Sequence, residues 1–335
     1  MATARSLGRV ALTAVVATAL ALGGSAATAS AKDVDLSTSS RSSVAKAYND
    51  VLAPALRVKT GWSGSAASCK RGSESKASLR ATRKAVNFVR ALNQLDEIKL
   101  DSKLNKKALS TALLMQANGA LSHSPSRSTH ARCWSSTGRV AASRSNLYLS
   151  WGHAGDRAPS TGARAILGYM TDAGSGNLAV GHRRWIMNPS TRVMASGSTS
   201  TANALTVFGT RTSSKARQPR FLEWPAKGWF PEQLEPQGRW SLSASSRSAD
   251  FSRAKVKVAR VDSRGKVLKK HKVTVHREQR GYGPHTLVFT VKGVKQPTGK
   301  KTVRYKVTVT GIKGVKGVKG SRYSYTVKLF DPTKF

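Results

Sequence analysis

Apolar residues recur every three or four positions in the first two thirds of the chain, a period that predicts amphipathic helices. The predicted helices cover residues 78–95, 103–121 and 159–171. The second is expected to stop near Ser124-Pro125, because proline disfavours the helical conformation in the residue before it. A short segment at 181–188 and strands near 192–199 and 203–209 complete this part of the chain.

The period changes to two after about residue 250, which predicts β-strands. The strands are expected at 254–261, 267–275, 287–291, 302–312 and 323–329. The alternation of apolar and charged residues places valines on the inner face of the sheet and lysines on its solvent-exposed face. Several strands separated by glycine-containing and charged turns predict a small antiparallel β-sandwich, of the Ig-like kind, over residues 250–335.

The first 31 residues have the pattern of a secretory signal peptide. Arg5 and Arg9 precede an apolar stretch at 10–22, and Ala29-Ser30-Ala31 is a small-x-small cleavage site. The alternative is a membrane anchor, but 13 apolar residues are too few to span about 30 Å of hydrocarbon as a helix. We therefore expect a secreted, extracellular protein associated with the cell wall, whose mature chain begins at Lys32.

The amino-acid composition restricts the classes of partner that the protein is expected to bind. The 335 residues include 57 basic and 16 acidic side chains, for a formal net charge of +41. Residues 251–335 alone hold 23 basic and 3 acidic side chains. Outside a cell the accessible anions are wall polymers, lipid headgroups and extracellular DNA. We expect an anionic cell-wall polymer or lipid headgroups as partners, and no specific nucleic acid, because no recognition helix or stacking motif is visible.

The two cysteines, Cys69 and Cys133, are too few for a disulfide-framework mini-protein or a four-cysteine zinc site. In an oxidising compartment an isolated pair is most simply one disulfide. The alternative is a pair of free or metal-bound thiols.

Composition shifts also divide the mature chain. Residues 32–75 form a partly helical lead-in that starts with a serine-rich, flexible segment at 33–45. A first domain is expected over 76–212. Residues 213–249 carry Trp224, Trp229 and Trp240 among prolines, which favours an ordered connector packed between this domain and the sandwich.

Three segments in order resemble those of a known family. They are Ala-Leu-Ser-His-Ser-Pro at 120–125, Ser-Asn-Leu at 145–147 and Gly-His-Arg-Arg-Trp-Ile-Met-Asn-Pro at 181–189. Over roughly 78–210 the chain is similar to a bacterial SCP-like domain of the CAP superfamily, named for cysteine-rich secretory proteins, antigen 5 and pathogenesis-related proteins. The resemblance implies an α-β-α sandwich for 76–212, and so an α+β protein with a C-terminal β-rich extension.

The resemblance also implies a cleft with two histidines and two acidic residues that can bind a divalent metal such as zinc. The histidines match His123 and His182. Asp172 stands at one acidic position, whereas the other is occupied by Ser145. His123, Asp172 and His182 are thus a plausible metal set. The alternative is a purely structural or ligand-binding cleft.

Two of these residues have further interpretations. Asp172 closes a helix, where the helix dipole disfavours an anion, so a nearby metal or protonated histidine would explain its position. The other interpretation is a solvated turn residue. Ser145 could be a nucleophile with His182 as its base, but no nucleophile elbow surrounds it.

Candidate anion-binding residues lie in two places. Arg183 and Arg184, beside His182, have planar guanidinium groups that suit anionic ligands. The tract with Lys313, Lys316 and Lys319 is a glycine-rich basic loop. The alternative for both is solvated charge.

Three functions fit these observations. The first is a secreted CAP-domain protein of the bacterial cell envelope that binds an anionic wall or lipid component and takes a smaller ligand in its histidine-lined cleft. The second is a metal-dependent hydrolase of peptide or cell-wall substrates, with the catalytic candidates His123, Ser145, Asp172 and His182. The third is an extracellular polyanion or nucleic-acid binder. The sequence leaves enzymatic activity undecided.

Overall fold

The computed structural model of the protein describes residues 1–2, 32–150, 161–278 and 281–335. Residues 32–335 form one compact unit, separate from residues 1–31. Residues 3–31 of the expected signal peptide, and Pro159 at the expected start of the third helix, lie outside the described residues. No helix among the described residues is long and apolar enough to cross a membrane.

The first part of the unit is built on a four-stranded sheet with the order β1-β3-β4-β2. The strands are β1 (Lys99–Leu100), β2 (Ser145–Leu149), β3 (Val193–Ser198) and β4 (Ala202–Thr206). β1 runs parallel to β3, and the other pairs are antiparallel.

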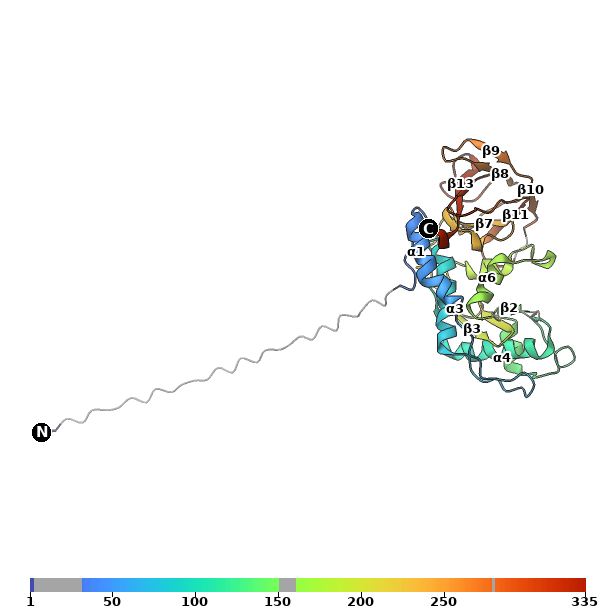
Figure 1. Ribbon diagram of the computed structural model, residues 1–335. Helices are drawn as coiled ribbons and strands as arrows, with labels where there is room; N and C mark the ends of the chain where they lie inside the picture. The colour runs from blue at the N-terminus through green and yellow to red at the C-terminus, as the bar shows by residue number, and fades with distance from the viewer. Residues whose placement is uncertain (3–31, 151–160, 279–280) are drawn as a thin grey trace. The chain divides into compact units, whose positions relative to one another are not determined.

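Five helices accompany this sheet: α3 (Lys76–Ala91), α4 (Ser102–Asn118), α5 (Ser136–Ala142), α6 (Ala163–Thr171) and α7 (Gly181–Ile186). Because side chains alternate along a strand, the two faces of β4 enter different cores. Ala204 packs with α4 and α5, whereas Leu205 belongs to the core that contains α3 and α6. This is the α-β-α layering that the resemblance implied (Figure 1).

The helices begin and end where local chemistry sets their boundaries. The side chains of Ser75 and Asp101 accept hydrogen bonds from the backbone amides three residues on, which caps α3 and α4. α4 ends at Asn118, earlier than the proline rule predicted, because Gly119 adopts a left-handed φ of 60°.

The second part of the unit is a β-sandwich of two sheets. The four-stranded sheet has the order β10-β11-β7-β5, and the five-stranded sheet has the order β6-β13-β12-β8-β9. All pairs are antiparallel except β6 with β13. The rings of Trp240 and Tyr305, one from each sheet, meet with centroids 5.5 Å apart. The fold class is therefore α+β, as expected.

The strands of the sandwich are β5 (Phe221–Trp224), β6 (Gly228–Pro231), β7 (Arg239–Ala244), β8 (Lys255–Val261), β9 (Val267–Lys270), β10 (Val273–His276), β11 (His285–Val291), β12 (Val303–Thr310) and β13 (Arg322–Phe330). Residues 213–249, expected as a connector, supply β5, β6 and β7. Trp224 and Trp240 are fully buried there. The β-rich part thus starts near Phe221 rather than near 250.

The lead-in is packed rather than flexible from Arg41 onward. It forms α1 (Arg41–Ala47), a π-helical turn at Tyr48–Leu52 and the short α2 (Ala53–Ala55). Tyr48 meets Phe88 of α3 edge to face, with centroids 6.2 Å apart. Before α1, the carbonyl of Thr38 accepts a hydrogen bond from the amide of Trp229 in β6. The segment therefore contacts both the helices and the sandwich.

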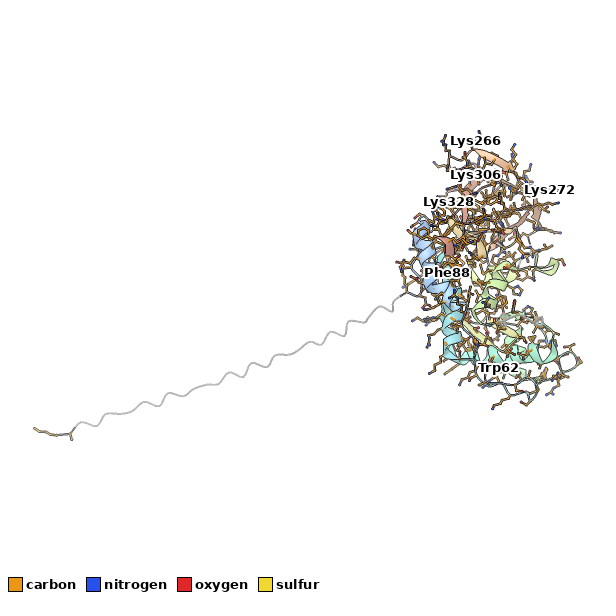
Figure 2. All side chains as sticks on the ribbon, viewed as in Figure 1. Trp62, Phe88, Lys266, Lys272, Lys306 and Lys328 are labelled. Atoms are coloured by element: carbon orange, nitrogen blue, oxygen red, sulfur yellow. A yellow bond between two sulfur atoms is a disulfide. The ribbon has the colours of Figure 1, made fainter. Side chains whose placement is uncertain are left out.

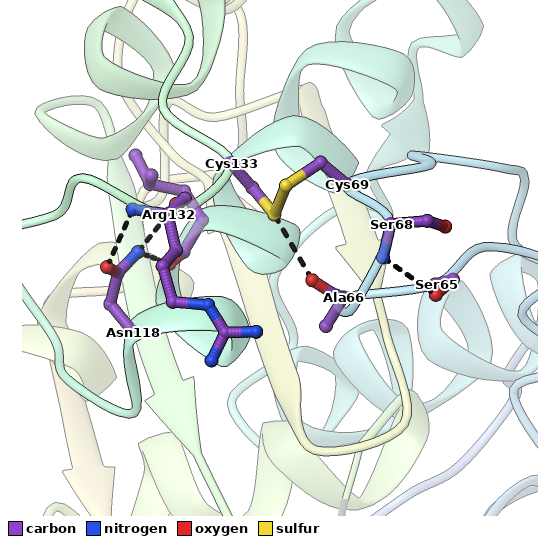
Figure 3. Close-up of a disulfide and its surroundings, with 8 residues drawn as sticks. Ser65, Ala66, Ser68, Cys69, Asn118, Arg132 and Cys133 are labelled. Atoms are coloured by element: carbon purple, nitrogen blue, oxygen red, sulfur yellow. Dashed lines mark hydrogen bonds between the residues drawn. A yellow bond between two sulfur atoms is a disulfide. The ribbon is translucent and has the colours of Figure 1, made fainter.

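One disulfide, Cys69–Cys133, confirms the expected pairing and closes a separation of 64 residues. It ties the loop before α3 to the loop before α5 (Figure 3). On the Cys133 side, the Asn118 amide donates to the carbonyl of Arg132 at 2.8 Å, which holds this loop against the end of α4.

Candidate functional site

A cleft of about 250 Å³ opens beside α7. Its described lining comes from the loop after α4, the turn after α5, β2, the turn before α7, α7 itself, the loop after β4 and the loop between β10 and β11. The described lining residues are His123, Ser143, Ser145, Asn146, Gly176, Asn177, Ala179, Gly181, His182, Trp185, Phe208, Gly281 and Tyr282. The cleft therefore gathers both predicted histidines and Ser145.

His182 is held by Asp172. Its Nδ1 lies 2.7 Å from the Asp172 Oδ1, and its ring stacks on Tyr169 with centroids 5.4 Å apart. Asp172 ends α6 with a left-handed φ of 54°, and its side chain is fully buried. Its second carboxylate oxygen accepts the backbone N–H of Arg183 at 3.3 Å. The interpretation of Asp172 as a solvated turn residue is therefore wrong, and His182 is the partner that explains its position.

This arrangement fixes which ring nitrogen of His182 remains for a ligand. Nδ1 is committed to the carboxylate, so Nε2 is the atom left for the cleft. His123 is oriented in the same way, because its Nδ1 lies 3.1 Å from the carbonyl oxygen of Ala142. The two histidines thus have one ring nitrogen each in use within the fold.

Ser145 is not placed as a nucleophile. It is buried, and its hydroxyl donates to the carbonyl of Ala141 at 2.8 Å. It also forms a hydrogen bond with the hydroxyl of Thr206 at 3.0 Å, and among the described residues it has no hydrogen bond to His182. The structure therefore gives no support to a serine hydrolase site.

Arg183 and Arg184 are not the exposed anion site that the sequence suggested, because both are buried. The Arg183 guanidinium donates to the carbonyls of Met170, Thr171 and Arg239 and to the Ser241 hydroxyl. Burial lowers the pKa of Arg183 to about 10. On α7, His182 and Trp185 line the cleft, whereas the two consecutive arginines between them face into the protein rather than into solvent. Arg183 joins the helical layers to β7.

One comparison with known proteins identifies part of the chain. Residues 83–208 match the family model of the cysteine-rich secretory protein family, CAP. This segment is a CAP domain. Comparisons with curated proteins and with solved structures each found no match.

The CAP domain does not gather a metal-ligand set among the described residues. No group of three or more His, Cys, Asp or Glu side chains is close enough to hold a metal ion there. Asp172 has both carboxylate oxygens engaged by protein donors, and Ser145 supplies no charge. The expected set of His123, Asp172 and His182 therefore does not fit a divalent metal, because Asp172, the only carboxylate in the set, is hydrogen-bonded to His182.

The sandwich contributes one residue to the CAP cleft that no pattern in the sequence indicated. Tyr282 lies in the loop between β10 and β11, 100 positions from His182, and lines the same cleft. A Cβ on Gly181 would approach the Tyr282 ring to 2.6 Å, so only glycine admits the ring at this distance. An aromatic residue between two glycines was the one available signal, and it points to no particular partner.

A second candidate surface lies on the five-stranded sheet, away from the CAP domain's cleft. The outward positions of β8, β9, β12 and β13 carry seven basic side chains, and five of them are exposed. We call this set the basic face. Its members are Lys255, Lys257, Lys270, Arg304, Lys306, Arg322 and Lys328. Among the described residues, no ion pair joins any of them to a carboxylate.

The basic face contains no acidic position to balance its charge. Arg304 and Lys328 stand directly opposite each other on β12 and β13, where like charges destabilise a sheet. Lys270 and Lys306 flank Ala259 in one cross-strand row. The glycine-rich loop with Lys313, Lys316 and Lys319 is also exposed.

Proposed function

We propose that this protein is a secreted binding protein of the bacterial cell envelope, retained on an anionic wall polymer by the basic face. The observation that carries the proposal is the basic face, whose outward lysines and arginines on β8, β9, β12 and β13 share these positions with uncharged residues such as Thr308 and Ser324 and with no Asp or Glu. A teichoic-type polymer, which repeats a phosphate along a flexible chain, is the class of partner that this surface fits.

The spacing of the basic face supports a repeating anion. Strands lie about 4.8 Å apart and alternate residues along a strand about 7 Å apart, so neighbouring cations lie within one Debye length of about 8–10 Å. Their potentials add, which attracts a polyanion more strongly than a single small anion. A phosphate between Arg304 and Lys328 would offset the repulsion that this pair otherwise suffers.

Secretion is part of the proposal and rests on two features. The first is the signal-peptide pattern of residues 1–31. The second is the Cys69–Cys133 disulfide, a bond typical of oxidising compartments. We expect the protein isolated from culture medium to begin at Lys32, as N-terminal sequencing would show. A chain that begins at Met1 would contradict this.

A matched pair of variants tests the basic face. The first is Lys257→Gln/Lys306→Gln/Arg322→Gln, and the control is Lys99→Gln/Lys103→Gln/Lys106→Gln in the CAP domain, where all three lysines are exposed. Both lose three charges. At about 1 kcal/mol for each cation near an anionic surface, the basic-face variant should bind immobilised poly(glycerol phosphate) more than tenfold less tightly.

The control variant should bind nearly as well as the unmodified protein. Equal loss in the two variants would show that only net charge matters, and full retention by the basic-face variant would overturn the proposal.

One observation favours anionic lipid as a second candidate partner. Val267 and Leu268 of β9 are 49% and 54% exposed, and they lie between Lys266 and Lys269. Apolar side chains beside lysines suit an interfacial contact with acidic headgroups. Figure 2 shows Lys266 and Lys272 on this end of the sandwich. Binding to phosphatidylglycerol vesicles that is lost in Leu268→Asp, while polymer binding persists, would favour this candidate. Equal vesicle binding by Leu268→Asp would exclude it.

A further inference from the structure

The cleft differs in charge from the rest of the molecule. None of its described lining residues is Asp, Glu, Lys or Arg, although the chain carries 57 basic side chains. An anionic ligand would find no arginine or lysine among these residues. The cleft therefore suits an uncharged ligand, and its function is separate from that of the basic face.

Three aromatic side chains line the cleft, Trp185, Phe208 and Tyr282, and we call this set the aromatic wall. Trp185 and Phe208 meet with ring centroids 4.0 Å apart and planes at 62°. Phe208 and Tyr282 are 39% and 37% exposed, and among the described residues the other exposed aromatic is Phe335. Two of the three exposed aromatic side chains thus border the same cavity, where they remain available to a ligand.

The Tyr282 part of this wall is fixed by several contacts. The ring packs against Gly181, where a Cβ would leave only 2.6 Å. The Arg184 guanidinium lies 5.5 Å from the ring centroid and donates to the carbonyl of Pro284 at 2.9 Å. These contacts hold Tyr282 before a ligand arrives, so little conformational entropy is lost when one binds.

The same cleft is also lined by polar groups that can form hydrogen bonds. His123 and His182 each have one ring nitrogen in use within the fold and one left. The Asn146 side chain donates to the carbonyl of His182 at 3.1 Å, and no donor among the described residues bonds to its Oδ1. Hydrogen-bonding groups and aromatic rings that line one cleft match a molecule with an apolar C–H face and a rim of hydroxyls.

We propose that the cleft binds one neutral sugar ring of a glycan, stacked on Trp185, Phe208 and Tyr282. The volume of about 250 Å³ suits a single ring rather than a longer stretch of chain. The polar lining residues disfavour a fatty acyl chain, which has no hydrogen-bonding groups for the histidines and Asn146. The sandwich then has a second role, because its Tyr282 completes the sugar site of the CAP domain.

The test uses the mature full-length protein with two neutral probes, tetra-N-acetylchitotetraose and maltotetraose. Binding is followed by intrinsic tryptophan fluorescence, since Trp185 lines the cleft, and by calorimetry. At least one probe should bind, and high salt should leave its affinity unchanged. Tyr282→Ala should raise the Kd about three- to tenfold, as expected for the loss of one aromatic stacking partner.

Three further variants make the test decisive. Phe335→Ala removes an exposed aromatic far along the chain and should leave the Kd unchanged. Phe208→Ala removes a different part of the wall and should weaken binding even if Tyr282→Ala folds poorly. The basic-face triple variant should bind the sugar normally, which separates this proposal from polymer retention. Failure of both sugars to bind, or binding unaffected by Tyr282→Ala and Phe208→Ala, would overturn the proposal.

Discussion

Burial gives the same residue type different roles in different parts of this protein. Arg183 is enclosed and donates to four different residues, whereas the arginines of the basic face have no carboxylate partner among the described residues. Asp172 is likewise enclosed and serves His182. Residues adjacent in sequence to a histidine that lines the cleft therefore need not line the cleft themselves.

Arg183→Met tests the structural role of this arginine. Loss of its guanidinium leaves several buried carbonyl groups without a donor, which we expect to lower the free energy of unfolding by about 2–4 kcal/mol. Urea denaturation measures this, with the exposed Arg211→Met as a control of unchanged stability. Polymer binding by the folded variant should be normal. Normal stability with lost polymer binding would restore Arg183 as an anion-binding residue.

Glu74 gives the protein a pH-dependent stability. Burial raises the pKa of this carboxyl from 4.5 to about 7, although Ser78 and the amide of Ser198 donate to it. Between these two values the folded protein binds more protons than the unfolded chain, so stability falls as pH rises. We expect a loss of about 2–3 kcal/mol across this range.

Glu74→Gln imitates the protonated carboxyl and should flatten the dependence of stability on pH between about 4.5 and 7. Urea denaturation at several pH values measures the slope. An unchanged slope in the variant would assign the pH dependence to other groups.

At the scale of elements, the period of the hydrophobic residues predicted the positions of the longer helices and strands well. The apolar face of α3 at Ala85, Val86 and Val89 is fully buried, and strands β8, β11, β12 and β13 lie where alternation placed them. The period of the hydrophobic residues did not predict strands that are short or buried on both faces. β2 and β5 have mostly buried residues and show no clean alternation. The expected strand at 267–275 is two strands, β9 and β10, that belong to different sheets.

The candidate site was predictable only in part, for a related reason. The short motifs carrying His123 and His182 identified two cleft residues because a family pattern contains them. Tyr282 reaches the cleft through tertiary packing of a distant loop, and no local pattern encodes that contact. The side-chain directions of Arg183 and Arg184 also depend on what packs against α7.

The disulfide is the covalent tie between two loops of the CAP domain region. A closed loop of 64 residues constrains the unfolded chain, and its removal should cost about 2–5 kcal/mol. Cys69→Ser/Cys133→Ser should therefore lower the midpoint of urea denaturation, whereas reduction of this variant should have no further effect. Equal stability of the variant and the oxidised protein would contradict a stabilising role.

At the scale of the whole molecule, the basic face and the cleft occupy different surfaces, so the two proposed binding sites are separate. The basic face lies on the outer side of the five-stranded sheet, and the described lining of the cleft carries no lysine or arginine. The separation has a physical advantage, because a polymer held by long-range attraction does not compete with a neutral ligand for the same groups. Retention and recognition can then act on different parts of one envelope.

The most direct test of the central claim is the salt dependence of binding to poly(glycerol phosphate). The logarithm of the association constant should fall linearly with the logarithm of salt concentration, as it does when a protein displaces counterions from a phosphate polymer. Lys257→Gln/Lys306→Gln/Arg322→Gln should reduce the slope by about two to three, at about 0.7–0.9 for each lost phosphate contact. The control Lys99→Gln/Lys103→Gln/Lys106→Gln should keep the original slope. An unchanged slope in the basic-face variant would contradict the account.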